Sequence, residues 1–186
     1  FLNNKLGKRK EKVIVSIYGK KLEIKILNVN IYNVLASLAV LRELNIKYDN
    51  ILKTYEQVEP SIGRGKIHEV KRYNKKFKLI DESYNANPLS VKNALNNLSK
   101  IKKIKKSKKY LIIGDMLELG KNSNIYHKEL SKLINKSDID KVFVKGEKTL
   151  FTYKNLKKEK RGNIFQCNSD ADLILRNIIA QNDYLM

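Results

Sequence analysis

The sequence predicts an α/β protein whose larger part is a Rossmann-like domain built on a mostly parallel sheet. Short apolar runs typical of strands alternate with segments of helical period from residue 77 to the last residue. Strands and helices that alternate at this spacing favour a parallel sheet with right-handed crossovers. Before them, residues 12–28 alternate between apolar and polar side chains around a glycine, which predicts a β-hairpin. Residues 60–65 hold a proline and two glycines and are expected to separate the two parts.

The first part is expected to span residues 1–59 and to contain the hairpin and two helices. Gly19 lies in the predicted turn, and the runs on either side of it are apolar at every second position. These positions are Val13, Val15, Ile17, Leu22, Ile24 and Ile26. Helical spacing of apolar residues then runs from Asn30 to about Leu44, and a second, short helix is predicted over residues 49–57.

The second part is expected to be a domain over residues 60–186 that is truncated at its end. Its strands are predicted at residues 77–81, 110–113, 141–144, 163–167 and 183–186. Its helices are predicted at residues 88–101, 123–135 and 170–180. Asn87 is expected to cap the first of these helices, because asparagine is a favoured N-cap residue and Pro88 suits the first helical position.

The chain is strongly basic, with 39 basic and 19 acidic residues among 186 and a net charge of +20. Only six of the basic residues are arginine, whereas nucleic-acid binders normally add arginines for bidentate contacts and aromatic residues among the bases. Lys, Asn and Ile have A/T-rich codons, so a genome of low GC content would produce many lysines without selection for a polyanionic partner. We therefore interpret the basic excess as a consequence of genome composition. A basic α/β module that binds RNA or DNA is kept as an alternative. The lysine run at residues 100–109 is interpreted as a solvated helix end rather than a phosphate-binding patch.

Cysteine content and hydropathy limit the environment of the protein. The single cysteine, Cys167, rules out an intrachain disulfide and fits a reducing compartment, so the cytoplasm is expected. No apolar run reaches about 18 residues, so no membrane span is expected. The chain is also expected to be a monomer that binds no nucleic acid.

The segment Asp81–Pro88, with the sequence DESYNANP, is the most specific in the chain. It lies between a predicted strand and a predicted helix, and open α/β sheets bind ligands at the carboxyl ends of their strands. A carboxylate there can accept from two ribose hydroxyls, and Ser, Tyr and Asn side chains offer donors and acceptors to a polar substrate. Ordinary turn chemistry explains the Asn-Pro pair well but the whole octet poorly.

Four ordered segments resemble the Mur ligases that add D-alanyl-D-alanine to the peptidoglycan precursor (the MurF type). Asp81–Pro88 resembles the D-D-S-Y-N-A-N-P signature of that family. Gly114–Gly120, followed by His127, resembles its G-D-M-x-E-L-G segment with a downstream histidine. Asn30–Ala36 resembles H-N-V-Y-N-A-L-A at the end of the central ATPase domain, and Gly63–Arg64 matches the G-R at the junction with the C-terminal domain.

The resemblance implies a fragment of an ATP-dependent ligase, with ATP and Mg²⁺ as cofactors of the full-length enzyme. Its substrates would be UDP-N-acetylmuramoyl-tripeptide and D-alanyl-D-alanine, joined through an acyl phosphate. The residues implied to bind ATP are Asn30, Asn33, Arg64 and Asp81: two amides for adenine, a guanidinium for phosphates and a carboxylate for ribose. The residues implied to line the substrate site are Ser83, Tyr84, Asn85, Asn87, Asp115 and Glu118. His127 is left outside the chemistry, and no catalytic residue or metal ligand is assigned.

The chain also departs from the family pattern. No Gly-Lys pair is followed by Ser or Thr, so the family's P-loop has no counterpart, nor do its metal-binding acid and modified lysine. Val29 stands where the family usually has histidine, and Glu82 replaces the second aspartate of the octet. The chain alone is therefore expected to be inactive, as the back end of a larger ligase whose N-terminal domain is absent. A sibling Mur-type ligase for another amino acid is a closer alternative, against which the Tyr84–Asn87 core argues.

Overall fold

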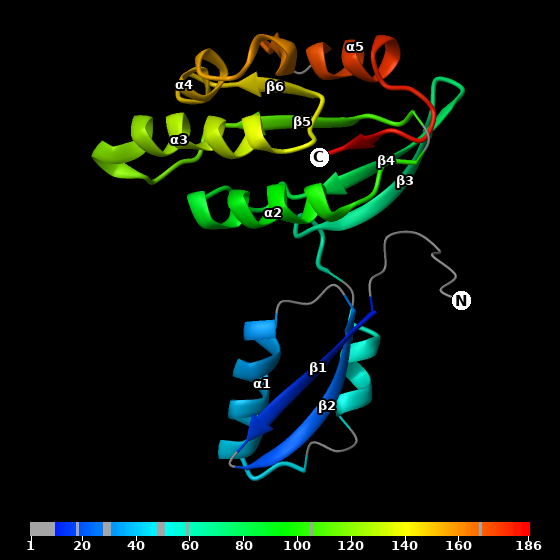
Figure 1. Ribbon diagram of the computed structural model, residues 1–186, viewed down its shortest axis with the longest axis vertical. Helices are drawn as coiled ribbons and strands as arrows, with labels where there is room; N and C mark the ends of the chain where they lie inside the picture. Colours follow the sequence, from blue (N-terminus) through cyan, green and yellow to red (C-terminus); the bar gives the residue numbers. More distant parts are fainter. Residues whose placement is uncertain are drawn as a thin grey trace. The chain divides into compact units, whose positions relative to one another are not determined.

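The computed structural model describes residues 10–17, 19–27, 31–47, 51–58, 60–104, 106–167 and 169–186. The chain divides into two compact units, Phe1–Ser61 and Ile62–Met186 (Figure 1). The division lies within residues 60–65, where the sequence leads us to expect the two parts to separate. Asn30 lies outside the described residues.

In the first unit, strands β1 (Lys10–Ile17) and β2 (Lys20–Leu27) form the antiparallel hairpin that the sequence predicts. Gly19 adopts a φ of +80° in the turn, which glycine reaches without steric cost. Helix α1 (Ile31–Glu43) and the 3-10 helix η1 (Leu52–Glu56) pack against the hairpin, and η1 replaces the short α-helix that was predicted. The core of this unit consists of Val15, Leu22, Ile24, Ile26, Val34, Leu38 and Tyr55.

The second unit is built on a six-stranded sheet with the order β3-β4-β8-β5-β6-β7. The strands are β3 (Lys66–Arg72), β4 (Lys75–Asp81), β5 (Lys109–Gly114), β6 (Lys141–Lys145), β7 (Arg161–Ile164) and β8 (Tyr184–Leu185). All neighbouring strands are parallel except β3 and β4, which form an antiparallel hairpin. The mostly parallel α/β sheet predicted from the alternation of strands and helices is therefore confirmed.

Helices cover both faces of this sheet (Figure 1). They are α2 (Pro88–Lys100), α3 (Ser123–Lys136), α4 (Thr149–Lys154) and α5 (Ser169–Asn177), with 3-10 turns η2 (Gly120–Asn122) and η3 (Lys158–Lys160). Leu111 and Ile113 join the core cluster that contains α2 and α3, whereas Tyr110 and Phe143 join the cluster of α5. This alternation follows from the period of two in a strand. Among the described residues, no helix is both long and apolar enough to cross a membrane.

The structure contains elements that the sequence did not predict. Strand β3 pairs with β4 through a tight turn at Tyr73 and Asn74, whose φ angles are 51° and 57°. Positive φ at both central residues is the geometry of a type I′ hairpin turn. Helix α4 was also missed, and β7 begins at Arg161 instead of Asn163.

The lysine run at residues 100–109 is only partly solvated, which corrects the interpretation from the sequence. The Lys109 side chain is completely buried, and its Nζ lies 2.6 Å from the Asp138 carboxylate. Nearby, the Lys103 Nζ lies 2.6 Å from the carboxylate of Asp140. The last lysine of the run is therefore a buried member of an ion pair, because β5 begins at that residue.

Candidate functional site

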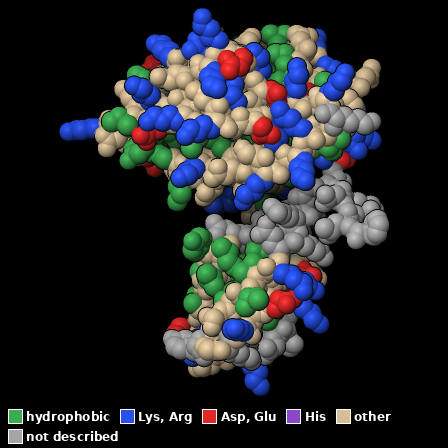
Figure 2. Space-filling view, viewed as in Figure 1, with side chains coloured by type: hydrophobic (Ala, Val, Ile, Leu, Met, Phe, Trp, Pro, Cys, Tyr) green, Lys and Arg blue, Asp and Glu red, His purple; other side chains and the backbone are tan. Residues whose placement is uncertain are grey.

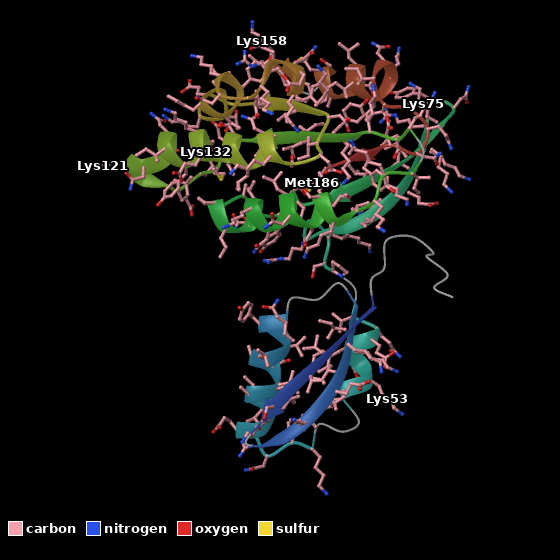
Figure 3. All side chains as sticks on the ribbon, in the orientation of Figure 1. Lys53, Lys75, Lys121, Lys132, Lys158 and Met186 are labelled. Atoms are coloured by element: carbon pink, nitrogen blue, oxygen red, sulfur yellow. The ribbon has the colours of Figure 1, made fainter. Side chains whose placement is uncertain are left out.

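The two segments with the most specific chemistry follow neighbouring parts of one sheet edge. Asp81 ends β4, and Asp115 comes directly after β5. Strand β8 pairs in parallel with both, and Figure 3 labels Met186, which follows it. Because the carboxyl ends of parallel strands meet at the same edge, the octet and the segment after β5 share the edge at which α/β sheets bind ligands.

The Asp81 carboxylate is held by three donors. Its Oδ1 accepts from the Ser83 hydroxyl at 2.6 Å and from the Ser83 backbone N–H at 3.1 Å. Its Oδ2 accepts from the Gly63 backbone N–H at 3.0 Å. These bonds, with that of the Ser83 hydroxyl the largest, hold the pKa of Asp81 below its ordinary value. The carboxylate is therefore ionised at neutral pH, with about one of its roughly four acceptor positions left for a ligand.

The segment Gly63–Gly65 folds onto the octet. The Gly63 carbonyl accepts from the Tyr84 N–H at 3.1 Å, and the Gly65 N–H donates to the Asp81 carbonyl at 2.8 Å. Gly63 has a φ of +77°, and a Cβ there would lie 2.8 Å from the Tyr84 Cβ. Only glycine permits this approach. The result places the Arg64 guanidinium 4.2 Å from the centre of the Tyr84 ring.

Glu82 is a partly buried carboxyl that the sequence analysis did not assign to the site. Burial raises its pKa, and the charge of Asp81 raises it further. Its Oε1 lies 3.1 Å from the position that a Cβ on Gly65 would occupy. The sequence does show two adjacent acids, Asp81 and Glu82, at the end of a predicted strand, and this pair could have pointed to Glu82. Their surroundings push the two pKa values apart, so that Glu82 holds a proton more readily than Asp81.

The remaining octet residues divide between exposed and structural positions. Ser83, Tyr84 and Asn85 are exposed at the loop. Asn87 caps α2 as predicted, because its Oδ1 accepts from the Ser90 N–H at 2.8 Å while the Ser90 Oγ accepts from the Asn87 N–H at 2.9 Å. The carboxamide oxygen of Asn87 is thus occupied by the helix, and its amide nitrogen makes no hydrogen bond within the described residues.

The segment after β5 is tied to the next loop along the sheet. The Asp115 Oδ1 accepts from the backbone N–H of Thr149, the first residue of α4, at 2.7 Å. Gly146 has a φ of +122°, and a Cβ there would fall 2.3 Å from the Asp115 carboxylate. Glu118 is exposed with a φ of +61°, which is uncommon for a residue other than glycine. Asp115 therefore ties the segment after β5 to the loop before α4, whereas the Glu118 side chain is exposed to solvent.

His127 supports the same segment from α3. It is fully buried, and its Nε2 accepts from the Met116 backbone N–H at 2.9 Å. Its Nδ1 lies 2.8 Å from the Ser123 carbonyl. Since Nε2 is an acceptor, Nδ1 carries the proton and donates to that carbonyl, so the ring is neutral. The histidine therefore holds the backbone of this loop.

The residues implied to bind adenine and those implied to bind phosphate, ribose or substrate belong to different parts of the chain. Asn33 is exposed on α1 in the first unit, and Asn30 precedes that helix outside the described residues. Arg64, Asp81, Ser83, Tyr84, Asn85 and Asn87 gather around one loop of the second unit. Within the described ranges, no group of three or more His, Cys, Asp or Glu side chains is placed to hold a metal ion.

The sequence resembles known proteins over most of the second unit. A model of the family "Mur ligase, glutamate ligase domain" matches residues 65–183. The UDP-N-acetylmuramoyl-tripeptide--D-alanyl-D-alanine ligase of Bacillus subtilis (strain 168) is 30% identical over 118 residues, which cover 63% of this chain and 25% of that protein. The ligase of the same name from Rickettsia prowazekii (strain Madrid E) is 38% identical over 91 residues, 49% of this chain and 19% of that protein.

Solved structures share the fold across both units. The MurF ligase of Thermotoga maritima, in complex with ADP, aligns with a TM-score of 0.74 at 20% identity over 94% of this chain and 38% of that one. MurF from Acinetobacter baumannii aligns with a TM-score of 0.74 at 22% identity, covering 97% and 39%. The chain thus spans about a quarter of the Bacillus relative and under two fifths of these structures. Since the family model covers well over half of its residues, the chain belongs to the Mur ligase family.

Proposed function

We propose that the chain is the C-terminal part of a ligase that adds D-alanyl-D-alanine to UDP-N-acetylmuramoyl-tripeptide. Residues 1–59 would end the central ATP-binding domain, and residues 60–186 would form most of the C-terminal domain. The observation that carries this proposal is the docking of Gly63–Gly65 onto Asp81–Tyr84, which joins two segments that resemble family motifs. The curated relatives named above carry the same activity in their names.

The first unit offers separate support for a larger central domain. Helix α1 and the turn after it expose Val40 and Leu44 to 58% and 63%. A groove beside α1 and β1 is lined largely by apolar side chains, with a volume of about 280 Å³. Apolar surface of this kind is typical of a face that packs against further protein.

We assign the nucleotide to the loop around Asp81. The Arg64 guanidinium would contact phosphate oxygens, and Asp81 would accept from one ribose hydroxyl through its remaining acceptor position. The amides of Asn30 and Asn33 would pair with adenine. ATP, when bound, would supply the phosphoryl group that activates the substrate carboxylate. Mg²⁺ would have its ligands elsewhere in the ligase, since the described residues offer it no cluster.

We assign the peptide substrates to the same edge of the sheet. Ser83, Tyr84 and Asn85 are exposed there, and Asn87 retains its amide nitrogen for a ligand. Glu118 would contact substrate directly, whereas Asp115 would act by fixing the loop that carries it. The cytoplasm remains our proposal for the location, and the monomer for the assembly.

Two alternatives lead to different measurements. A nucleic-acid-binding module would show affinity with a steep salt dependence in an electrophoretic shift titration. On the face shown in Figure 2, however, Lys and Arg side chains are scattered among other residues over the second unit instead of forming one patch. A sibling ligase would accept a single amino acid in place of the dipeptide.

The decisive experiment is a ligation assay on two proteins. The 186-residue chain alone should give no product from ATP, Mg²⁺, UDP-N-acetylmuramoyl-tripeptide and D-alanyl-D-alanine. A chimera in which this chain replaces the matching region of the Bacillus subtilis ligase should release ADP only when the dipeptide is present. Product from the chain alone, or ADP release with single amino acids only, would contradict the proposal.

Asp81 can then be tested in the same chimera. Replacing Asp81 with alanine should raise the KM for ATP with less effect on the KM for the dipeptide. Glu159→Ala, an exposed acid on η3, is the matched control and should change neither constant. An unchanged ATP KM in the Asp81 variant would remove this residue from the nucleotide site.

A further inference from the structure

Arg64 differs from the other arginines that stack on aromatic rings. Within the described ranges, four guanidiniums lie over tyrosine rings, and three of them also form an ion pair or hydrogen bonds with the protein. Arg72 and Arg176 pair with Asp172 at 3.0 and 3.7 Å. Arg161 donates to two backbone carbonyls at 2.8 and 3.1 Å. These three contacts are therefore structural.

The Arg64 guanidinium, in contrast, contacts the Tyr84 ring and makes no hydrogen bond or ion pair among the described residues. At 4.2 Å from the ring centre, it lies well within the distance of about 6 Å at which a cation is attracted to an aromatic face. Stacking uses the flat face of the guanidinium and leaves its five N–H donors at the edge. This arrangement orients the group without occupying any of the donors that a phosphate requires.

The backbone brings the two residues close together. The Tyr84 N–H donates to the Gly63 carbonyl at 3.1 Å, and the Gly63 N–H donates to the Asp81 carboxylate at 3.0 Å. With no room for a Cβ at Gly63, the residue before Arg64 is in direct contact with Tyr84. Both side chains belong to the compact unit Ile62–Met186. The backbone segments that carry the arginine and the ring are therefore joined within one unit.

We propose that Tyr84 is a positioning residue whose ring orients the Arg64 guanidinium toward a phosphate of the nucleotide. The inference rests on the proposed function and differs from a direct contact of Tyr84 with substrate. A long, exposed side chain otherwise samples many rotamers and must lose that freedom when it binds. A contact made in the transition state acts on kcat. Loss of a cation–π contact at an exposed position should lower kcat by about two- to fivefold.

The stacking can be measured directly in the 186-residue chain by NMR. The Arg64 Hδ and Nε–H signals should be shifted upfield by the ring current in the wild type and in Tyr84→Phe, which keeps the ring. Tyr84→Leu should abolish the shift, while the signals of Arg161, which lies over Tyr153, remain unchanged as an internal reference. An Arg64 shift that survives in Tyr84→Leu would overturn the proposal.

Positioning is tested by a double-mutant cycle in the active chimera. Tyr84→Leu should lower kcat, Tyr84→Phe should restore it, and Tyr84→Leu should have no further effect once Arg64 is replaced by methionine. An equal loss in both backgrounds, or a Tyr84→Phe defect as large as that of Tyr84→Leu, would show that Tyr84 contacts substrate itself. If the chimera makes no product, the proposed function fails, and the NMR comparison still decides whether the ring holds the arginine.

Discussion

Replacing Gly63 with alanine tests the docking of the Gly63–Gly65 segment onto the octet. Gly63 has a φ of +77°, and an added Cβ would lie 2.8 Å from the Tyr84 Cβ and 2.9 Å from the Tyr84 nitrogen. Neither the backbone nitrogen nor the Cβ can move without shifting the loop. The variant therefore has two courses, to keep the docked loop under strain or to release it.

Both courses are costly by similar amounts. Keeping the loop imposes a left-handed conformation on alanine, about 1–2 kcal/mol, together with the overlap against Tyr84. Releasing it loses the bond from Gly63 to the Asp81 carboxylate, about 1.5–3 kcal/mol for a charged acceptor, and a neutral backbone bond of about 1 kcal/mol. The variant adopts whichever of the two states costs less free energy. We therefore expect the free energy of unfolding to fall by about 2–4 kcal/mol.

Gly120→Ala is the matched control. Gly120 has a φ of +57° in the same unit, and nothing lies within 4 Å of a Cβ built there. Its substitution should cost only the conformational part, about 1–2 kcal/mol. Urea unfolding followed by circular dichroism compares the two, and amide exchange at Tyr84 reports on loop release. Equal losses in the two variants would refute the close contact between Gly63 and Tyr84.

Three further predictions follow from buried or charged contacts. His127→Phe should lower the free energy of unfolding by about 1–3 kcal/mol in urea titrations, since the buried Met116 N–H loses its acceptor. Lys109→Met should leave that free energy unchanged or raise it, whereas Asp138→Ala, which strands the buried ammonium, should cost about 3 kcal/mol. The fold lowers the pKa of Asp81 below its ordinary value of 3.8. The ionised carboxylate therefore stabilises the fold above pH 3.8, and this stabilisation is lost as the pH falls through the lower pKa of the folded protein. Urea unfolding between about pH 6 and pH 3 should therefore show a steeper loss for the wild type than for Asp81→Asn, and parallel curves would contradict this.

Elements with strong local signals were predictable from the sequence. Helix α2 has a capping residue, a proline at its first position and a regular apolar stripe, and the structure confirms both the helix and the Asn87 cap. Strand β3 has no such signal, because its apolar residues Ile67 and Val70 are three apart. Its pairing depends on a turn at Tyr73 and Asn74, and this pair is not one of the glycine-containing pairs that predict a type I′ turn.

The burial of the Lys109 charge could not be predicted from the sequence for a related reason. Lys109 lies at the end of a lysine run, and the run suggests solvent. Its partner Asp138 is 29 residues away, in the loop before β6, and only the parallel pairing of β5 with β6 brings the two together. Local composition cannot predict a contact that the sheet creates.

The same distinction applies to the site. The bond between Ser83 and Asp81 spans two residues and is ordinary turn chemistry, so the octet could be recognised as a compact polar loop. The contacts that give the loop its shape span much longer separations. The hydrogen bond between Gly63 and Tyr84 joins residues 21 apart in the sequence, and that between Asp115 and Thr149 joins residues 34 apart.

The division of hydrogen-bonding groups at this edge indicates what kind of ligand it fits. Three side-chain acceptors are used by the fold, since Asp81 receives three donors, Asp115 Oδ1 receives the Thr149 N–H and the Asn87 oxygen caps α2, whereas the Glu118 carboxylate is exposed. By contrast, the donors of the Arg64 guanidinium and the Asn87 amide nitrogen make no hydrogen bond among the described residues. Around the octet, acceptors that the fold uses beside donors that it leaves unused favour a ligand rich in acceptors, such as a phosphate chain. The large positive charge of the whole chain is not needed for this preference, because one arginine and one amide nitrogen beside the octet already supply unused donors.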